Sequence, residues 1–226
     1  MRVTIHQPDF MPWLGFFDRW RASDLFIVLD DVQFLRRGWH HRDKIKTAAG
    51  PIWITVPVQQ KGKFEQPIRE VLLDGGSWKR KHLASIRASY GRAPRFSRLF
   101  PLLEEVYSKP HVRLIDLNMD ILILFAELLG ITTPVAFASA SNVTGHGTAR
   151  LVQLCMLHGA RNYLTGTGSR DYLDESLFTA QGIHVEWQHF EHPVHPQLHG
   201  SFITGLSALD SMMMGCAWPV EAADEA

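Results

Sequence analysis

The chain has 226 residues, 46% of them hydrophobic, and its 23 basic and 23 acidic residues give a formal net charge of zero. A chain of this size and composition can bury one hydrophobic core, so we expect a single globular domain over residues 1–226. Because the charges balance, the whole molecule has no field that attracts nucleic acid or a membrane surface. The composition thus excludes a protein that binds such polyanions through its net charge.

The sequence also predicts a cytoplasmic protein. No basic N-terminal region precedes an apolar core, and no uninterrupted apolar run reaches 18 residues, so we expect neither secretion nor a membrane span. Cys155 lies in an apolar helical run and Cys216 follows a methionine-rich segment. These two cysteines fit free thiols in a reducing compartment better than a disulfide framework.

Strands and helices alternate along most of the chain. Pro8 ends the first strand, because proline cannot donate to a strand ladder, and an aromatic-rich turn at residues 9–17 leads into a helix. The alternation predicts an α/β fold with a mainly parallel central sheet flanked by helices. The expected strands are residues 2–6, 25–29, 52–56, 68–73, 133–138, 162–165 and 183–187, and the expected helices of the second half are 148–158 and 173–181.

The middle of the chain, from about residue 77 to 130, is predicted to be helical. Helices are expected at 78–92, 96–107 and 114–129. In the last of these, Leu117, Ile121, Leu124 and Leu128 repeat at intervals of four and three, and Gly130 supplies the stop. We interpret this helical segment as an insertion between the two sheet-forming halves.

Polar side chains follow the first two predicted strands. His6 and Gln7 end the first strand, and Asp30, Asp31 and Gln33 follow the second. Parallel strands deliver such residues to one edge of a sheet, where α/β proteins place their chemistry. A carboxylate beside a histidine fixes its tautomer, so we predict a catalytic group with His6 as general base. The alternative is a structural histidine and an aspartate that caps a helix.

Two further segments could bind an anion. Arg42 and Lys46 are four residues apart and could share a helix face that clamps a phosphate or carboxylate, although without a partner a solvated charged turn is favoured. Thr165 and Gly166 open a glycine-containing loop between a strand and a short helix, where the backbone can approach a ligand. An ordinary strand-to-helix turn is the alternative there.

A histidine-rich stretch and a basic stretch complete the candidates. Five histidines fall between His184 and His199, but without helical metal-ligand spacing, so we expect a loop over the site and no bound metal or cofactor. Residues 78–98 contain no acidic residue, and this basic face suits an acidic carrier protein or phosphate groups unless it is merely solvated. Its cations are Lys79, Arg80, Lys81, Arg87, Arg92, Arg95 and Arg98.

The chain resembles the WbqC-like protein family over nearly its whole length. The resemblance rests on residues 5–8, 12–15, 30–34, 42–46 and 56–58, and later on 159–160, 163–166, 172–173, 182–183, 197, 206–207 and 210. Asp43 stands where the family usually has asparagine, and His195 where tyrosine is usual; residues 212–215 also replace the more usual Leu-Phe-Asn-Gly.

This resemblance implies amide-forming acyl transfer. A glycyl or similar acyl group would pass to an amine acceptor such as an amino sugar, from a donor on an acidic carrier protein or coenzyme A. Trp13, Tyr172, His195 and Gln197 join Arg42, Lys46, Thr165 and Gly166 as expected substrate-binding residues. Two alternatives stay open, namely a nucleotide-dependent enzyme and a non-catalytic binding protein.

Overall fold

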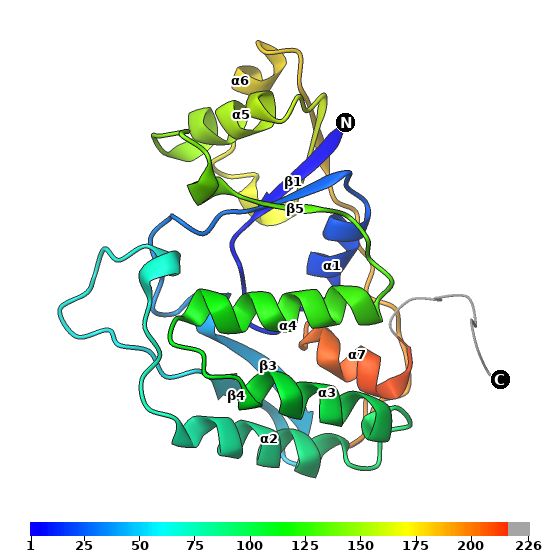
Figure 1. The fold of residues 1–226 in the computed structure, drawn as a ribbon. Coiled ribbons are helices and arrows are strands. Elements are labelled where there is room, and N and C mark those ends of the chain that lie inside the picture. Colours follow the sequence, from blue (N-terminus) through cyan, green and yellow to red (C-terminus); the bar gives the residue numbers. More distant parts are fainter. Residues whose placement is uncertain (217–226) are drawn as a thin grey trace. The chain divides into compact units, whose positions relative to one another are not determined.

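The computed structural model describes residues 1–216, which form two compact units built from discontinuous stretches of chain (Figure 1). Unit 1 comprises Met1–Gln7, Gly15–Val32 and Ile131–Glu191. Unit 2 comprises Pro8–Leu14, Gln33–Gly130 and the chain from His192 onward. The chain therefore crosses from one unit to the other five times, and neither unit is a continuous segment.

Unit 1 is built on a five-stranded sheet in which all neighbouring strands are parallel. The strand order is β5–β2–β1–β6–β7, so β1 lies at the centre. The predicted α/β fold with a mainly parallel sheet is confirmed. The strands are β1 (Arg2–His6), β2 (Leu25–Val28), β5 (Val135–Phe137), β6 (Asn162–Thr165) and β7 (His184–Trp187).

Both faces of this sheet are covered, which explains why its strands are almost continuously apolar. On one face α1 (Leu14–Arg21) packs through aromatic rings, and Trp20 stacks on Phe26 of β2 with the ring centroids 4.5 Å apart. On the other face Ile27 belongs to a buried cluster with residues of α5 (Gly147–Leu157) and α6 (Glu175–Thr179). Short 3-10 turns follow β5 and β6, at Ala138–Ala140 and Thr167–Ser169.

Unit 2 combines a β-hairpin with the predicted helical middle segment, which is confirmed. The hairpin pairs β3 (Arg42–Thr47) with β4 (Gly50–Thr55), and α3 packs beside both α2 and α4 (Figure 1). Within residues 1–216, no helix has both the length and the apolar character needed to cross a bilayer. The helices are α2 (Ser77–Tyr90), α3 (Phe96–Ser108), α4 (Leu114–Leu128) and α7 (Ala208–Met214), with 3-10 turns at Trp39–His41 and Ile68–Glu70.

The placement of residues 52–56 in the parallel sheet was wrong. Most of this run belongs to β4, which pairs antiparallel with β3, and Gly50 adopts a positive φ of 102° where the hairpin turns. The expectation that Arg42 and Lys46 share a helix face was also wrong, because both lie on β3. The run of charged residues concealed this strand, since nothing in the sequence shows which charged side chains become buried.

The expected strand at 68–73 is instead a 3-10 turn followed by two isolated bridges. Ile68 and Val71 are both fully buried, and the Val71 N–H donates to the Ile68 carbonyl. A turn with three residues per repeat points both side chains inward, whereas a strand would point them to opposite faces. Leu72 and Leu73 retain single bridges to Arg113 and Val58.

Asn118 of α4 ties the N-terminal stretch of unit 2 to its helices. Its fully buried side-chain amide donates to the carbonyls of Pro8 and His40, each at 2.7 Å. Pro8 lies outside every helix and strand, and His40 lies in the short 3-10 turn Trp39–His41. Asn118 thereby satisfies two buried carbonyl groups at once.

We expect Asn118→Ala to lower the free energy of unfolding by about 2–4 kcal/mol, because two buried acceptors lose their donor. Urea unfolding followed by circular dichroism measures the change. Glu127→Ala, at an exposed position of the same helix, is the matched control and should change stability by less than about 0.5 kcal/mol. Equal effects of the two substitutions would contradict the role assigned to Asn118.

Candidate active site

The strand order of unit 1 reverses between β1 and β6. From β1 the chain continues to β2 and β5 on one side, and it later returns to β6 and β7 on the other side. In open parallel sheets, ligands bind at the carboxyl ends of the two strands that flank such a reversal. The residues that follow β1 and β6, His6–Gln7 and the loop after Thr165, are therefore the structural candidates for a site.

β1 and β6 also separate before they end. Their ladder consists of the pairs Arg2–Asn162 and Val3–Tyr163, and the Thr4 hydroxyl then donates to the Leu164 carbonyl at 2.8 Å. On its other side β1 stays paired with β2 as far as His6. Ile5 and His6 therefore have no partner residue in the β1–β6 ladder. The two strands separate at the point where the strand order reverses.

His6 is oriented by the main chain. Its Nδ1 lies 2.9 Å from the Gln7 carbonyl oxygen, and its ring meets Phe16 edge to face with the centroids 5.0 Å apart. A carbonyl oxygen can only accept, so Nδ1 carries a hydrogen and the neutral ring has its lone pair on Nε2. In this tautomer Nε2 is the ring nitrogen that is able to accept a proton.

Asp30 and Asp31 both have partners in the neighbouring segments of unit 1. The buried Asp30 carboxylate accepts from the Ser139 N–H at 3.0 Å and from its hydroxyl at 2.6 Å. Asp31 forms a 2.6 Å ion pair with Arg150 of α5. We expected an aspartate to orient the His6 ring, but at Nδ1 the Gln7 carbonyl does so. A hydrogen bond between His6 and an aspartate stays a prediction.

The loop after β6 is held by hydroxyl groups and packed against an arginine. Ser169 lies 3.0 Å from the Thr165 hydroxyl and donates to the Gly166 carbonyl at 2.9 Å. The Arg19 guanidinium of α1, only 7% exposed, occupies the space that a Cβ at Gly166 would fill. Sequence analysis missed Arg19, because an arginine among Phe16, Phe17 and Trp20 reads as the solvated side of a helix.

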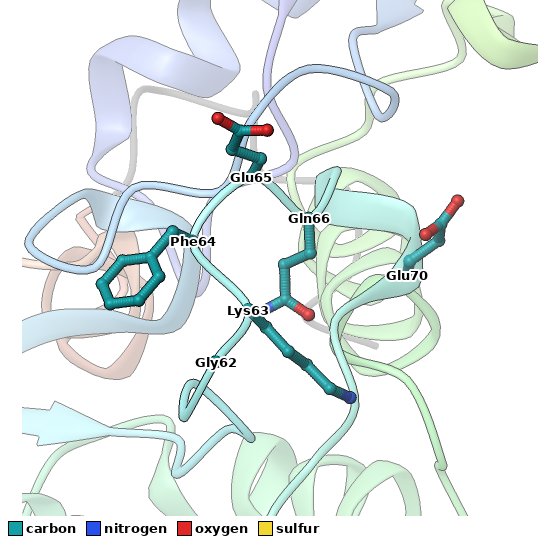
Figure 2. A pocket seen from close by; sticks show the side chains of 6 residues that line it. All are labelled: Gly62, Lys63, Phe64, Glu65, Gln66 and Glu70. Atoms are coloured by element: carbon teal, nitrogen blue, oxygen red, sulfur yellow. The ribbon is translucent and has the colours of Figure 1, made fainter.

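The other expected substrate-binding residues outside the buried network are partly or fully exposed. Tyr172 in unit 1 is 70% exposed. In unit 2, the Trp13 backbone forms an isolated antiparallel β-bridge with Ser207, and the Gln33 side-chain amide donates to the Phe64 carbonyl. Phe64 also lines a pocket of about 610 Å³ whose side chains point in different directions (Figure 2). These polar groups do not converge as those of a catalytic site would. The lining residues are Gly62, Lys63, Phe64, Glu65, Gln66 and Glu70.

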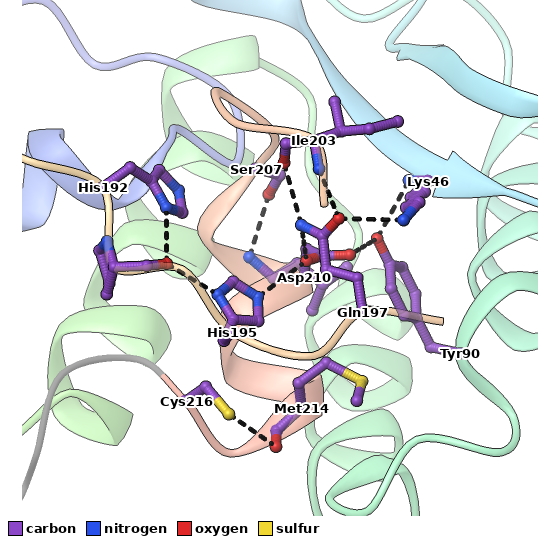
Figure 3. A network of polar contacts seen from close by, with 12 residues as sticks. Lys46, Tyr90, His192, His195, Gln197, Ile203, Ser207, Asp210, Met214 and Cys216 are labelled. Atoms are coloured by element: carbon purple, nitrogen blue, oxygen red, sulfur yellow. Dashed lines mark hydrogen bonds and ion pairs between the residues drawn. The ribbon is translucent and has the colours of Figure 1, made fainter. Parts of the chain in front are cut away.

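Lys46 is part of a buried network in unit 2 (Figure 3). Its side chain is 1% exposed, and Nζ donates to Gln197 Oε1 at 3.0 Å and to the carbonyls of Gly200 and Ser201 at 3.1 and 2.5 Å. An ammonium group has three hydrogens, and these three acceptors use all of them. Lys46 thus fastens the segment around residues 197–201 to β3 and keeps no N–H for the substrate anion that the sequence suggested.

Asp210 of α7 accepts three hydrogen bonds in the same network. Tyr90 donates to Oδ1 at 3.0 Å, while Gln197 and His195 Nε2 lie 2.8 and 3.2 Å from Oδ2 (Figure 3). His195 Nδ1 faces the Pro193 carbonyl at 3.0 Å, so both ring nitrogens face acceptors. Burial, with Asp210 close by, raises the pKa of Tyr90 and keeps its hydroxyl a donor. His195 and Gln197 therefore hold the C-terminal segment around one carboxylate.

We expect Asp210→Asn to lower the free energy of unfolding by about 3–5 kcal/mol, because three buried donors face a group that accepts less well. Urea unfolding measures the change. Asp116→Asn, which removes an exposed ion pair with Arg113, is the control and should cost less than about 1 kcal/mol. A loss at Asp210 no larger than that at Asp116 would mean that the network contributes little to stability.

Asp43, also in β3, is a buried carboxyl group. It is 1% exposed, and Oδ1 accepts the Lys44 N–H at 2.6 Å. Burial is the main cause that raises the pKa of Asp43 to about 8, and the nearby Asp9 carboxylate adds to it. At neutral pH the group is therefore protonated, and it offers one donor and one acceptor as a carboxamide does.

Asp43→Asn should remove part of the pH dependence of stability. Between the ordinary aspartate pKa of about 4 and the folded value of about 8, the folded state holds a proton that the unfolded state releases. Stability of the wild type therefore falls as pH rises through this window, by at most about 1.4 kcal/mol per pH unit from this group. The variant has no such ionisable group, so its free energy of unfolding should rise relative to that of the wild type as the pH rises.

Urea unfolding at about pH 5 and about pH 8 compares the two proteins. Asp74→Asn, at an exposed position of unit 2, is the control and should follow the wild type at both values. If Asp43→Asn also follows the wild type, the carboxyl group is ionised in the folded protein.

A five-stranded parallel sheet covered by helices on both faces defines an α/β protein. The chain belongs to the WbqC-like protein family, which matches residues 7–218. It is 37% identical over 211 residues to the uncharacterized protein Rv1507c of Mycobacterium tuberculosis, covering 92% of this chain and 91% of that protein. No solved structure matches the chain.

Proposed function

We propose that the protein is an acyltransferase that forms an amide bond on an amine acceptor, with His6 as the general base. The observation that carries the proposal is the hydrogen bond from His6 Nδ1 to the Gln7 carbonyl, at the end of β1 where the strand order reverses. This bond leaves the lone pair of the neutral ring on Nε2. An amine that attacks an acyl group must lose a proton, and Nε2 can accept it.

The reaction proposed is aminolysis of a thioester. The amine nitrogen bonds to the acyl carbon, His6 Nε2 takes the amine proton, and the resulting tetrahedral intermediate carries its negative charge on oxygen. That charge needs fixed donors, which the Arg19 guanidinium and the N–H groups of the loop after Gly166 could supply. The carbon–sulfur bond then breaks, and the imidazolium returns its proton to the leaving thiolate.

Most of the remaining predicted residues have binding roles in this proposal. Gln7 with Asp30 and Asp31 would shape the site at the ends of β1 and β2, and Tyr172 would contact substrate from the loop after β6. Gln33 stays a predicted catalytic residue, and Trp13 stays a predicted substrate-binding residue. The basic stretch of residues 78–98, which covers most of α2 and the start of α3, would receive an acidic carrier protein. In support, Arg80 and Lys81 are exposed there, although Arg87 is paired with Glu104 at 3.0 Å.

His6→Ala should lower the rate of amide formation by about 10²–10⁴, the usual cost of losing a general base. The assay incubates the protein with aminoacyl thioesters and amino-sugar acceptors, and mass spectrometry detects the amide. His189→Ala, at an exposed histidine of unit 1, is the control and should keep the wild-type rate. An unchanged rate in the His6 variant would exclude His6 as the base.

A nucleotide-dependent enzyme is the second candidate. The observation in its favour is again the reversal of strand order, because nucleotides bind at this point in many parallel sheets. Release of pyrophosphate from ATP that depends on an acyl or sugar substrate would favour this activity over direct acyl transfer.

A further inference from the structure

The hairpin of unit 2 carries an exposed aromatic and cationic surface outside the proposed active site. Trp39, in the turn before β3, is 47% exposed, and Trp53 on β4 is 41% exposed. Lys44 pairs directly with Trp53 across the hairpin, and Arg42 lies two residues before Lys44 on the same strand. We call these four residues the tryptophan patch.

The patch is organised around the Trp53 ring. The Arg42 guanidinium carbon lies 4.4 Å from the ring centroid, and Lys44 Nζ lies 4.9 Å from it. The ring of Trp39 is 5.2 Å from that of Trp53 and is tilted by 44°. Two cations thus contact one indole, and a second indole stands beside it. Cation–π contacts hold both charged groups close to the aromatic surface.

The positive charge of the patch is not neutralised by nearby carboxylates. Among the described residues, neither Arg42 nor Lys44 has an acidic partner within 4.0 Å. Arg42 donates to the Arg37 carbonyl at 2.7 Å, and its buried Nε has no hydrogen-bond partner in residues 1–216. Asp43 between them is buried and, with a pKa of about 8, does not offset the charge at neutral pH.

These features fit a ligand that combines a flat ring with phosphate groups. The indole of Trp39, which is 47% exposed, offers a face on which a base or sugar ring can stack, and such stacking is worth about 1–3 kcal/mol per base. A guanidinium carries several N–H donors in a planar fork that matches a phosphate, and an adjacent ammonium adds a point charge. A solvated surface would need neither two clustered tryptophans nor two unpaired cations on one ring.

We propose that the tryptophan patch binds the nucleotide part of a substrate, with phosphates on Arg42 and Lys44 and the ring system on Trp39 and Trp53. The proposal goes beyond the function proposed above, because it assigns to unit 2 by itself a binding site for a nucleotide, such as that of coenzyme A or of a nucleotide-activated amino sugar. The sequence had suggested that Arg42 and Lys46 bind an anion together. Lys46 is buried, and Lys44 instead shares the Trp53 ring with Arg42.

Isothermal titration calorimetry of the full chain with ADP and UDP tests the proposal without any turnover. We expect one of the two nucleotides to bind, and to bind at least tenfold more tightly than inorganic phosphate or the matching nucleoside. A preference for ADP indicates the coenzyme A source, and a preference for UDP indicates a nucleotide sugar. Added salt should weaken binding, because the phosphates meet cations that are partly open to solvent.

Two variants locate the site. Trp53→Leu and Arg42→Gln should each weaken binding of the preferred nucleotide by at least tenfold. Their matched controls are Phe64→Leu and Arg36→Gln, which alter another exposed cation–ring pair of unit 2, with 4.2 Å between the guanidinium and the ring centroid. Thermal unfolding verifies that each variant is folded, which is expected because Trp53 and Phe64 are both exposed.

Three results would overturn the proposal. These are no binding of either nucleotide at millimolar concentration, equal binding by patch variants and their controls, and tighter binding of a single-stranded oligonucleotide than of the mononucleotide. His6→Ala should leave nucleotide binding unchanged. Failure of the amide assay therefore contradicts the proposed acyl transfer alone, and failure of the titration contradicts the patch alone.

Discussion

Parallel pairing of β1 with two neighbours is the constraint on which unit 1 depends. The strand is only five residues long, yet it pairs with β2 along one edge and with β6 along the other. The segments that form β2 and β6 are separated by more than a hundred residues, and only β1 joins them. The same pairing brings the residues after Ile5 and those after Leu164 to one edge of the sheet. Fold and candidate site therefore have a common origin in one strand.

Unit 2 depends instead on buried polar groups. The hairpin is anchored through the ammonium of Lys46 and, by way of Tyr90, through the carboxylate of Asp210, each of which has three hydrogen-bond partners. Such a network is costly to desolvate and tolerates little change once formed, so it specifies one arrangement of the C-terminal segment. Asp43 avoids the cost of a buried charge by keeping its proton, which also explains how it can replace the asparagine usual in the family.

Much of unit 1 could be predicted because its strands are covered on both faces and read as apolar runs. The helix α4 was predictable because its leucines and isoleucines recur at helical spacing. The hairpin strand β3 was not, because its burial depends on partners such as Gln197 and Tyr90 that lie far away in sequence. The parts of the candidate site that lie at strand ends, His6 and Thr165, were predictable from the sequence. Arg19 and Ser139 entered only with the three-dimensional pairing of the strands, which no local pattern contains.

The contact between Gly166 and Arg19 has a consequence for evolution within the family. Gly166 has a φ of −82°, which any residue can adopt. A larger residue there is opposed by the Arg19 side chain and not by the backbone conformation. A methyl group there would overlap the guanidinium. The two positions, 147 residues apart in the chain, should therefore vary together: members with a larger residue at the loop position are expected to carry a shorter side chain on the first helix. A shorter side chain at position 19 makes no clash with Gly166, whereas a larger residue at position 166 requires the Arg19 guanidinium to move.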